Sequence, residues 1–284
     1  MRSERPIFQP KRPILRRDRP MSRRCTVSRF DHVWQYDADM ALRLPSQRTI
    51  PIGFAHRGAR AHVKENTSEA FDLAVKLGAS GIQSDVWLSK DGELMLHHDA
   101  HVGMRRRQIR LLDRSALPET MISLPELLAR VPESVEISIG INDDDAMGPL
   151  MAWAASIDPV TRSRLYLCHQ DWRRLAEWRA ADEHIQLVDA TNVGAMSEGP
   201  ERRASNLAEA GINAVMLRHS EWTGGMATLF HRFGRLCFGW DAQHRRILDD
   251  LLRMGLDGVY SDHVDTMMEA IDQRPPPPTG GVKL

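Results

Sequence analysis

The chain has 284 residues, with 38 basic and 38 acidic side chains, 42% hydrophobic residues and 27% charged ones. These proportions are typical of a globular protein and exclude a collagen-like, mucin-like or wholly disordered chain. The net charge of zero is unevenly distributed. Residues 1–30 contain ten basic and two acidic side chains, so this segment carries +8 and residues 31–284 carry −8.

Cysteine usage and hydropathy indicate the compartment. Cys25, Cys168 and Cys237 form no CxxC pair, which argues against a disulfide framework and against a zinc ribbon. No run approaches 18 apolar residues, so no transmembrane segment is expected. The paired arginines near the start are not followed by the apolar stretch that an export signal needs. We therefore expect a protein of the reducing cytoplasm.

Both ends of the chain have a composition that opposes packing. Residues 1–48 contain five prolines and no stable hydrophobic period, which predicts a disordered basic Pro/Arg-rich arm. This arm is either extra sequence ahead of a later start, at Met21 or Met40, or an electrostatic tether to nucleic acid or anionic lipid. Nothing in it indicates specific nucleic-acid binding. Residues 273–284, with four consecutive prolines, are predicted to be an unpacked tail.

The first expected elements are a strand, a helix and a second strand. Residues 52–55 form a short apolar run. A helix follows over 66–77, because the small polar residues at its start precede a glutamate as in a capping box, and Gly78 ends it. Its apolar residues recur with a helical period. Residues 81–88 form the next strand.

The pattern then continues to the end of the predicted domain. A turn at residues 90–92 leads into a hairpin arm over 93–97. Ser123 and Glu126 form a capping box that begins a helix over 124–131. Further helices are expected at 171–181 and 245–254, and further strands at 135–141, 164–168, 185–188, 212–217, 235–239 and 258–261.

Eight strands, each followed by a helix or helix-like segment, fall within about 230 residues. This alternation predicts parallel βαβ units, and eight of them predict an α/β protein with a (β/α)8 TIM barrel. We place this single domain at residues 49–272. A doubly wound sheet is the rival, but no G-x-G-x-x-G motif follows the first strand.

Polar residues follow the expected strands, whose carboxyl ends meet at one mouth of a barrel. His56 and Arg57 end the first strand, Gln83 and Asp85 share one face of the second, and His98 follows the hairpin. Two histidines can transfer the protons of a phosphoryl transfer, and a guanidinium can hold two phosphate oxygens. Other residues expected at the mouth are Gly140, Asn142, His169, Trp240 and Asp262.

Eight motifs in order resemble the glycerophosphodiester phosphodiesterase family, over about residues 50–272. They are 55–59 (AHRGA), 65–71 (ENTSEAF), 78–86 (GASGIQSDV), 89–92 (SKDG), 98–99 (HD), 122–128 (ISLPELL), 239–240 (GW) and 255–262 (GLDGVYSD). The resemblance implies a phospholipase-C-like phosphodiesterase barrel, in agreement with the strand count.

The resemblance also implies roles for individual residues. His56 and His98 fall on the catalytic acid/base pair, and Arg57 falls on the phosphate-binding arginine. Asp85 falls on a metal-binding carboxylate, and Glu65 lies near the metal and the arginine. The family's Ca²⁺ or Mg²⁺ is held by three acids. The implied substrate is a small phosphodiester or one derived from a lysophospholipid, cleaved to an alcohol and glycerol phosphate.

The metal site departs from the family pattern. Gln83 replaces an acid on strand two, and Gly140 and Asn142 stand where strand three has an acid and a lysine. An alternative register with Glu136 and Ser138 at these positions leaves too little strand before the acid. With Asp85, Glu65 and Gln83 as the remaining candidate ligands, we expect Ca²⁺ or Mg²⁺ to be weakly held or absent.

Three functions follow from this reading. The first is hydrolysis of a glycerophosphodiester or related small phosphodiester by His56 and His98, with Trp240, Gly140 and Asn142 lining the substrate pocket. The second is a metal-depleted relative that binds phosphodiesters without cleaving them. The third is a metal-independent lyase that forms a cyclic phosphate, since histidine chemistry suffices for attack by a neighbouring hydroxyl. The alcohol and the oligomeric state stay open.

Overall fold

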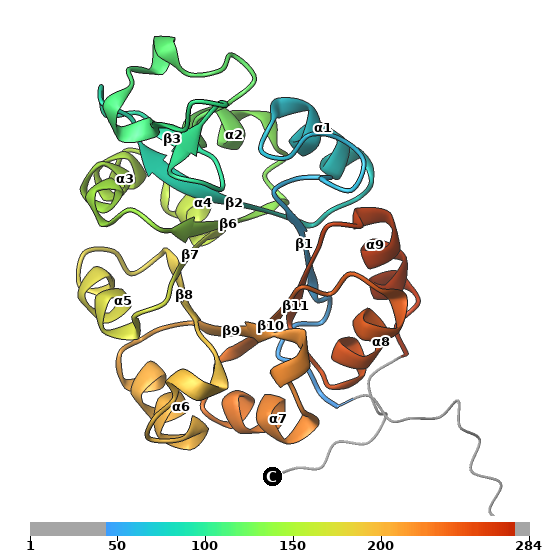
Figure 1. The fold of residues 1–284 in the computed structure, drawn as a ribbon. Helices are drawn as coiled ribbons and strands as arrows, with labels where there is room; N and C mark the ends of the chain where they lie inside the picture. The colour runs from blue at the N-terminus through green and yellow to red at the C-terminus, as the bar shows by residue number, and fades with distance from the viewer. Residues whose placement is uncertain (1–43, 276–284) are drawn as a thin grey trace, which may run out of the picture. The chain divides into compact units, whose positions relative to one another are not determined.

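The computed structural model describes residues 44–275. Most of the predicted basic arm and of the predicted tail lies outside the described residues. Eight parallel strands form a closed barrel (Figure 1), because β1 pairs with both β2 and β11. The TIM-barrel prediction is confirmed. The barrel strands in order are β1 (Ile52–His56), β2 (Gly81–Leu88), β6 (Glu136–Ile141), β7 (Leu165–His169), β8 (Gln186–Ala190), β9 (Ala214–Arg218), β10 (Leu236–Trp240) and β11 (Gly258–Ser261).

Helices surround the barrel, and sequence signals mark where several of them begin. Thr67 caps α1 by accepting a hydrogen bond from the Ala70 N–H at 3.2 Å. Ser123 and Glu126 form the predicted capping box ahead of α2. None of the helices in the described part is long and apolar enough to cross a bilayer. The helices are α1 (Ser68–Lys76), α2 (Leu124–Arg130), α3 (Met147–Ala155), α4 (Pro159–Ser163), α5 (Trp172–Arg179), α6 (Pro200–Glu209), α7 (Gly224–Arg232), α8 (Arg245–Arg253) and α9 (Val264–Asp272).

Several strands begin and end one or two residues later than their apolar runs predict. β7 includes His169, β9 includes Arg218 and β10 includes Trp240. Apolar side chains mark only the packed part of a strand, whereas the backbone hydrogen bonds of the ladder continue through polar residues. These extra residues therefore belong to the strands and lie at the ends that form the mouth.

Aromatic side chains fill the inside of the barrel below the mouth. Phe54, Tyr166, Phe238 and Tyr260 form a buried cluster, in which Phe54 and Tyr260 stack at 4.5 Å between ring centres. The barrel is a packed core, as its alternating inward-facing residues require. The larger apolar core lies between the strands and the helices.

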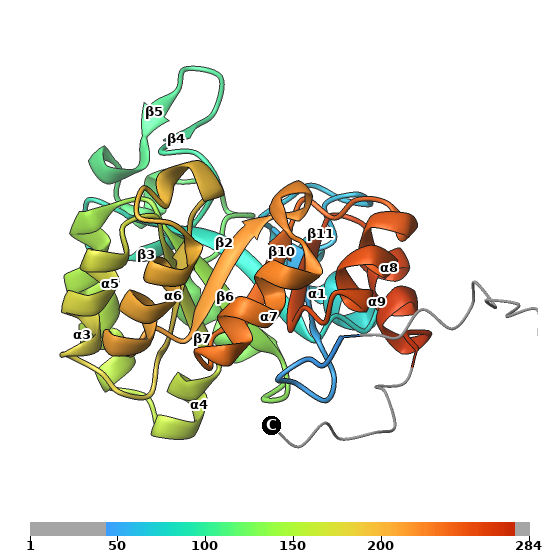
Figure 2. The same cartoon turned by 90° about the horizontal axis from the view of Figure 1, so that it is seen from below.

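The segment between β2 and α2 forms a small substructure outside the barrel (Figure 2). β3 (Leu94–Leu96) pairs antiparallel with β2, as the predicted hairpin arm requires, and β4 (His101–Val102) pairs with β5 (Arg107–Gln108) in a separate hairpin that the sequence pattern did not indicate. The substructure has its own small core of Met95, Val102, Ile109, Leu117 and Met121.

Candidate active site

A cavity of about 270 Å³ opens at the carboxyl ends of the barrel strands. It brings together most of the residues predicted for the mouth. His98 and Arg57 are not among its lining residues, and neither is Glu65. The predicted residues that line it are His56, Gln83, Asp85, Gly140, Asn142, His169, Trp240 and Asp262.

His56, at the end of β1, contacts a carboxylate at the end of the neighbouring strand, β11. Its Nδ1 lies 2.7 Å from Oδ1 of Asp262, which directly follows β11. Burial alone would raise the pKa of Asp262, but the hydrogen bond with His56 and the positive charge of Arg60 bring it below its usual value. Gln243 accepts a hydrogen bond from the Asp262 N–H at 2.9 Å and fixes the backbone there. The His56 ring therefore has a defined orientation.

Arg57 lies in a strained turn directly after His56. Its φ of 57° is in the left-handed region, which residues other than glycine rarely adopt. Gly58 follows with φ 82°, and a Cβ there would come within 2.7 Å of the Ala70 backbone in α1. The close approach of α1 therefore requires glycine at this position. This turn sets the position of Arg57.

Arg57 and Arg60 share one carboxylate. The Glu65 carboxylate accepts from Arg57 Nη1 at 3.1 Å and lies 3.1 Å from Arg60 Nε. Arg60 Nε also lies 3.7 Å from Asp262. The Arg57 Nε is buried and has no hydrogen-bond partner within residues 44–275. A buried donor of this kind is costly unless a ligand oxygen accepts from it.

Asp85 occupies the space beside Gly140. The two residues are register partners in the β2–β6 ladder, and a Cβ built on Gly140 would lie 2.2 Å from Asp85 Oδ1. Asn142 Nδ2 donates to the same oxygen at 3.2 Å. Glu136 instead pairs with Gly81 at the opposite end of β6. The ladder thus places Gly140, and not Glu136, next to Asp85.

The Asp85 carboxylate is buried and feels the charge of a guanidinium group. Burial raises its pKa above the usual value, and the positive charge of Arg57 acts in the opposite direction. The His98 side chain is 44% exposed, and its Nδ1 lies 3.1 Å from Oδ1 of Asp99. The mouth is therefore suited to an anionic ligand.

The residues present do not fit the three-carboxylate metal site that the resemblance implies. The Gln83 amide donates to the Ser84 carbonyl at 3.0 Å, and its oxygen accepts from the Arg57 N–H at 3.3 Å. Glu65 is occupied by two guanidinium groups. Among the candidate ligands, Asp85 is left as the one carboxylate without an ion pair in the described chain, and hard divalent cations prefer several anionic oxygens.

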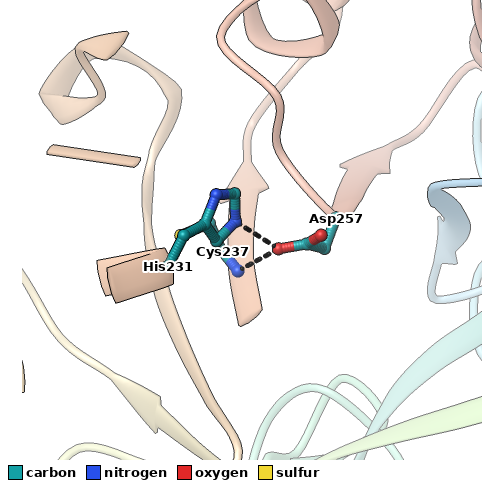
Figure 3. Close-up of side chains that lie close together, drawn as sticks. All are labelled: His231, Cys237 and Asp257. Carbon is teal, nitrogen blue, oxygen red and sulfur yellow. Dashed lines mark hydrogen bonds and ion pairs between the residues drawn. The ribbon is translucent and has the colours of Figure 1, made fainter. Parts of the chain in front are cut away.

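One group of three potential ligands lies elsewhere, between α7, β10 and β11 (Figure 3). Asp257 Oδ2 accepts from His231 Nε2 at 2.7 Å and from the Cys237 N–H at 2.8 Å. Its Oδ1 accepts from the Ser46 hydroxyl at 2.6 Å and from the Gln47 N–H at 2.7 Å. Both oxygens are thus already used, and this cluster ties residues 46–48 to the barrel instead of forming a free ion site.

Sequence reasoning missed several contributors to the mouth. The sequence pattern puts Asp262 at the mouth without assigning it a role, and it does not indicate Arg60 or Gln243. The adjacency of β1 and β11 in a closed barrel is the signal for the contact between His56 and Asp262, whereas the loop residue Arg60 has no sequence signature.

A second, open cavity of about 870 Å³ adjoins the first and shares Asn142 and His169 with it.

Comparisons with known proteins identify the family of the chain. Residues 56–266 match the profile of the "Glycerophosphoryl diester phosphodiesterase family". The Bacillus subtilis protein YhdW is 24% identical over 240 residues, covering 76% of this chain and 96% of its own length. Over 48 residues, the identity to a glycerophosphodiester phosphodiesterase of Caldanaerobacter subterraneus is 54%, covering 17% of this chain and 20% of that protein.

Solved structures show the same fold. A glycerophosphodiester phosphodiesterase from Thermotoga maritima superposes with a TM-score of 0.67 and 23% identity, covering 77% of this chain and 97% of that one. A phosphodiesterase from Oleispira antarctica, in complex with its product sn-glycerol-3-phosphate, gives 0.66 and 19%, with coverages of 79% and 98%. Enzymes of the matched family typically use a divalent metal and hydrolyse phosphodiesters. The chain belongs to the glycerophosphoryl diester phosphodiesterase family and is a phosphoric diester hydrolase.

Proposed function

We propose that this chain hydrolyses glycerophosphodiesters, or a related small phosphodiester, to an alcohol and glycerol phosphate by acid–base catalysis through His56 and His98. The observation that carries the proposal is the contact between His56 and Asp262. A histidine whose Nδ1–H donates to a carboxylate presents Nε2 as an acceptor and is stabilised when it takes up a proton. This is the arrangement of a general base.

The proposed reaction assigns one proton transfer to each histidine. Water attacks phosphorus while His56 Nε2 takes its proton, and the ester oxygen leaves with a proton from His98. The Asp262 carboxylate stabilises the imidazolium that forms on His56. The unpartnered Nε–H of Arg57 supports a role for this residue in holding a phosphoryl oxygen.

The charges at the mouth support a substrate with one negative charge at phosphorus. Arg57 and Arg60 share the single carboxylate of Glu65. A phosphodiester anion would accept from the Arg57 guanidinium, whose Nε–H has no partner within residues 44–275. The volume of about 270 Å³ is small for a whole phospholipid, which favours the water-soluble phosphodiester part of a lysophospholipid-derived substrate.

Phosphorus NMR on glycerophosphocholine tests the proposal. We expect glycerol phosphate as the product, and a loss of at least about 100-fold in turnover for both His56→Ala and His98→Ala. His62→Ala is the matched control, because His62 lies 3.6 Å from Asp265 and outside the cavity lining. If His56→Ala keeps wild-type turnover, the histidine mechanism is wrong.

The same spectra separate the alternatives. Accumulation of a cyclic phosphate in place of glycerol phosphate would identify a cyclising lyase. A rise in melting temperature with glycerophosphocholine and no product would identify a binding protein. Repeating the assay with EDTA, Ca²⁺ or Mg²⁺ shows whether turnover needs a divalent ion, since the described mouth offers Asp85 as its single unpaired carboxylate.

A further inference from the structure

The hairpin of β4 and β5 projects away from the barrel (Figure 2) and carries a tip that we define as residues 103–107. The Arg106 N–H donates to the Gly103 carbonyl at 3.0 Å, which closes a turn with Met104 at its apex. The Met104 side chain is fully exposed, with a relative accessibility of 103%. An exposed apolar side chain at the apex of a protruding turn has no packing role in this fold.

Three consecutive arginines of the hairpin tip follow this methionine, and Arg107 Nη2 donates to the Ala116 carbonyl at 3.3 Å. Arg105, Arg106 and Arg107 are all exposed, and none of them forms an ion pair with another residue of the described chain. The nearby Asp113 carboxylate lies 3.8 Å from the Lys90 ammonium and is already paired. The hairpin tip therefore concentrates positive charge on a protein whose residues 31–284 carry −8 in total.

The hairpin stands on the same side of the molecule as the mouth. His101 in β4 and Gln108 in β5 line the larger cavity, and this cavity shares Asn142 and His169 with the catalytic one. A surface that contacts the hairpin tip would therefore lie on the side to which the mouth opens.

We infer that the hairpin tip binds the surface of an anionic lipid bilayer. The arginines contact the lipid phosphates, and Met104 enters the boundary between headgroups and acyl chains, as apolar side chains of interfacial segments do. A nucleic acid would satisfy the arginines but leave Met104 uncovered, and residues 101–108 contain no phenylalanine, tyrosine or tryptophan on which bases could stack. The inference stands independently of the proposed catalytic function.

Vesicle binding of the full chain measures the contribution of charge. A basic residue at an anionic surface strengthens binding about fivefold, so replacing the three arginines by glutamine should weaken binding to vesicles of phosphatidylcholine and phosphatidylglycerol about 100-fold. A charge-matched control removes three exposed arginines from α6, α7 and α8, none of them in an ion pair within residues 44–275: Arg202→Gln, Arg232→Gln and Arg246→Gln. Equal losses in the two triple variants would overturn the inference.

A local probe separates the hairpin tip from the basic residues 1–30. A polarity-sensitive fluorophore is attached to Met104→Cys in a Cys25→Ser background, because the described cysteines Cys168 and Cys237 are buried. Val160→Cys in α4 is the matched site, since Val160 is also apolar and 79% exposed.

The expected result is a blue shift of the fluorophore at position 104 on anionic vesicles, lost at about 0.5 M salt, with no shift at position 160. If the chain sediments with the vesicles while the label at 104 keeps its aqueous spectrum, the hairpin tip is not the contact. A shift of that label with single-stranded DNA but not with vesicles would also reject the bilayer in favour of nucleic acid.

Discussion

Replacing Asp262 by asparagine removes one negative charge beside His56 and keeps the size of the side chain. The pair is separated by 2.7 Å, and the two side chains are 26% and 24% exposed. The attraction between an imidazolium and a carboxylate at this distance is about 1.5 kcal/mol in bulk water and about 6 kcal/mol at an effective dielectric constant of 20. A partly exposed pair lies between these limits, so we take about 3 kcal/mol.

This energy stabilises the charge that His56 acquires when it takes a proton from water. Its loss should lower kcat about 100-fold, because each 1.4 kcal/mol corresponds to a factor of ten in rate. KM should change less than about threefold, because the charge on His56 develops only in the transition state. Release of glycerol phosphate from glycerophosphocholine, followed by phosphorus NMR at neutral pH, measures both constants.

Asp265→Asn is the matched control. Asp265 is also an aspartate near the end of the barrel, and its Oδ1 lies 3.6 Å from a histidine, His62. It does not line the catalytic cavity. We expect its kcat to stay within about twofold of wild type. The reasoning is refuted if Asp262→Asn keeps wild-type kcat while remaining folded, or if both variants lose activity equally.

Three further variants test the packing of the mouth and of the cluster at Asp257. Gly140→Ala should displace the Asp85 carboxylate, because the new Cβ would lie 2.2 Å from Asp85 Oδ1. This displacement should lower turnover in the same NMR assay. A crystal structure of the variant with Asp85 in an unchanged position would contradict the prediction. Gln83→Glu should raise Ca²⁺ affinity about tenfold or more in calorimetry, since it adds a carboxylate near Asp85; unchanged affinity would show that these residues do not face a common ion. Asp257→Asn should lower the free energy of unfolding by about 3 kcal/mol in urea titration, because it weakens the buried pair with His231. A loss under about 0.5 kcal/mol would contradict the role of Asp257 in tying residues 46–48 to the barrel.

The Asp257 carboxylate also predicts how stability changes with pH. Burial alone would raise its pKa, but hydrogen bonds and the charge of His231 bring it below its usual value. A carboxyl group whose pKa is lower in the folded state stabilises the fold above its unfolded pKa of about 4, and this contribution is lost as pH falls below that value. Asp257→Asn should therefore flatten the acid side of a plot of melting temperature against pH, and an unchanged acid side would exclude Asp257 as its cause.

Much of the fold follows from the sequence, because strand and helix periods alternate and the caps are local signals. The Ser123–Glu126 capping box needs only neighbouring residues, and it forms as expected. The exact strand ends do not follow in the same way. His169 and Trp240 extend their strands through backbone pairing that side-chain polarity does not report.

For the candidate site, the sequence predicts which residues lie at the ends of the strands. Closure of a barrel places the residue after the last strand beside the end of the first, so the contact between Asp262 and His56 could have been anticipated from topology alone. The position of the Asp85 carboxylate over Gly140 could not, because it depends on a side-chain rotamer and on the Asn142 amide. The protruding β4–β5 hairpin also gave no periodic signal, since each of its strands has two residues.

The number of carboxylates at the mouth determines how closely its positively charged side chains can approach a phosphodiester. A site with three carboxylates repels a phosphodiester until a divalent cation neutralises them. In this chain Gln83 and Gly140 stand where the resemblance implies two of those carboxylates, and Asp85 accepts a hydrogen bond from Asn142 Nδ2. Arg57, His56 and their neighbours then face fewer competing anions, so the phosphate can approach with less help from an ion. The dependence of KM on added Ca²⁺ should therefore be weak in this chain and become stronger in Gln83→Glu; equal dependence in both proteins would reject this argument.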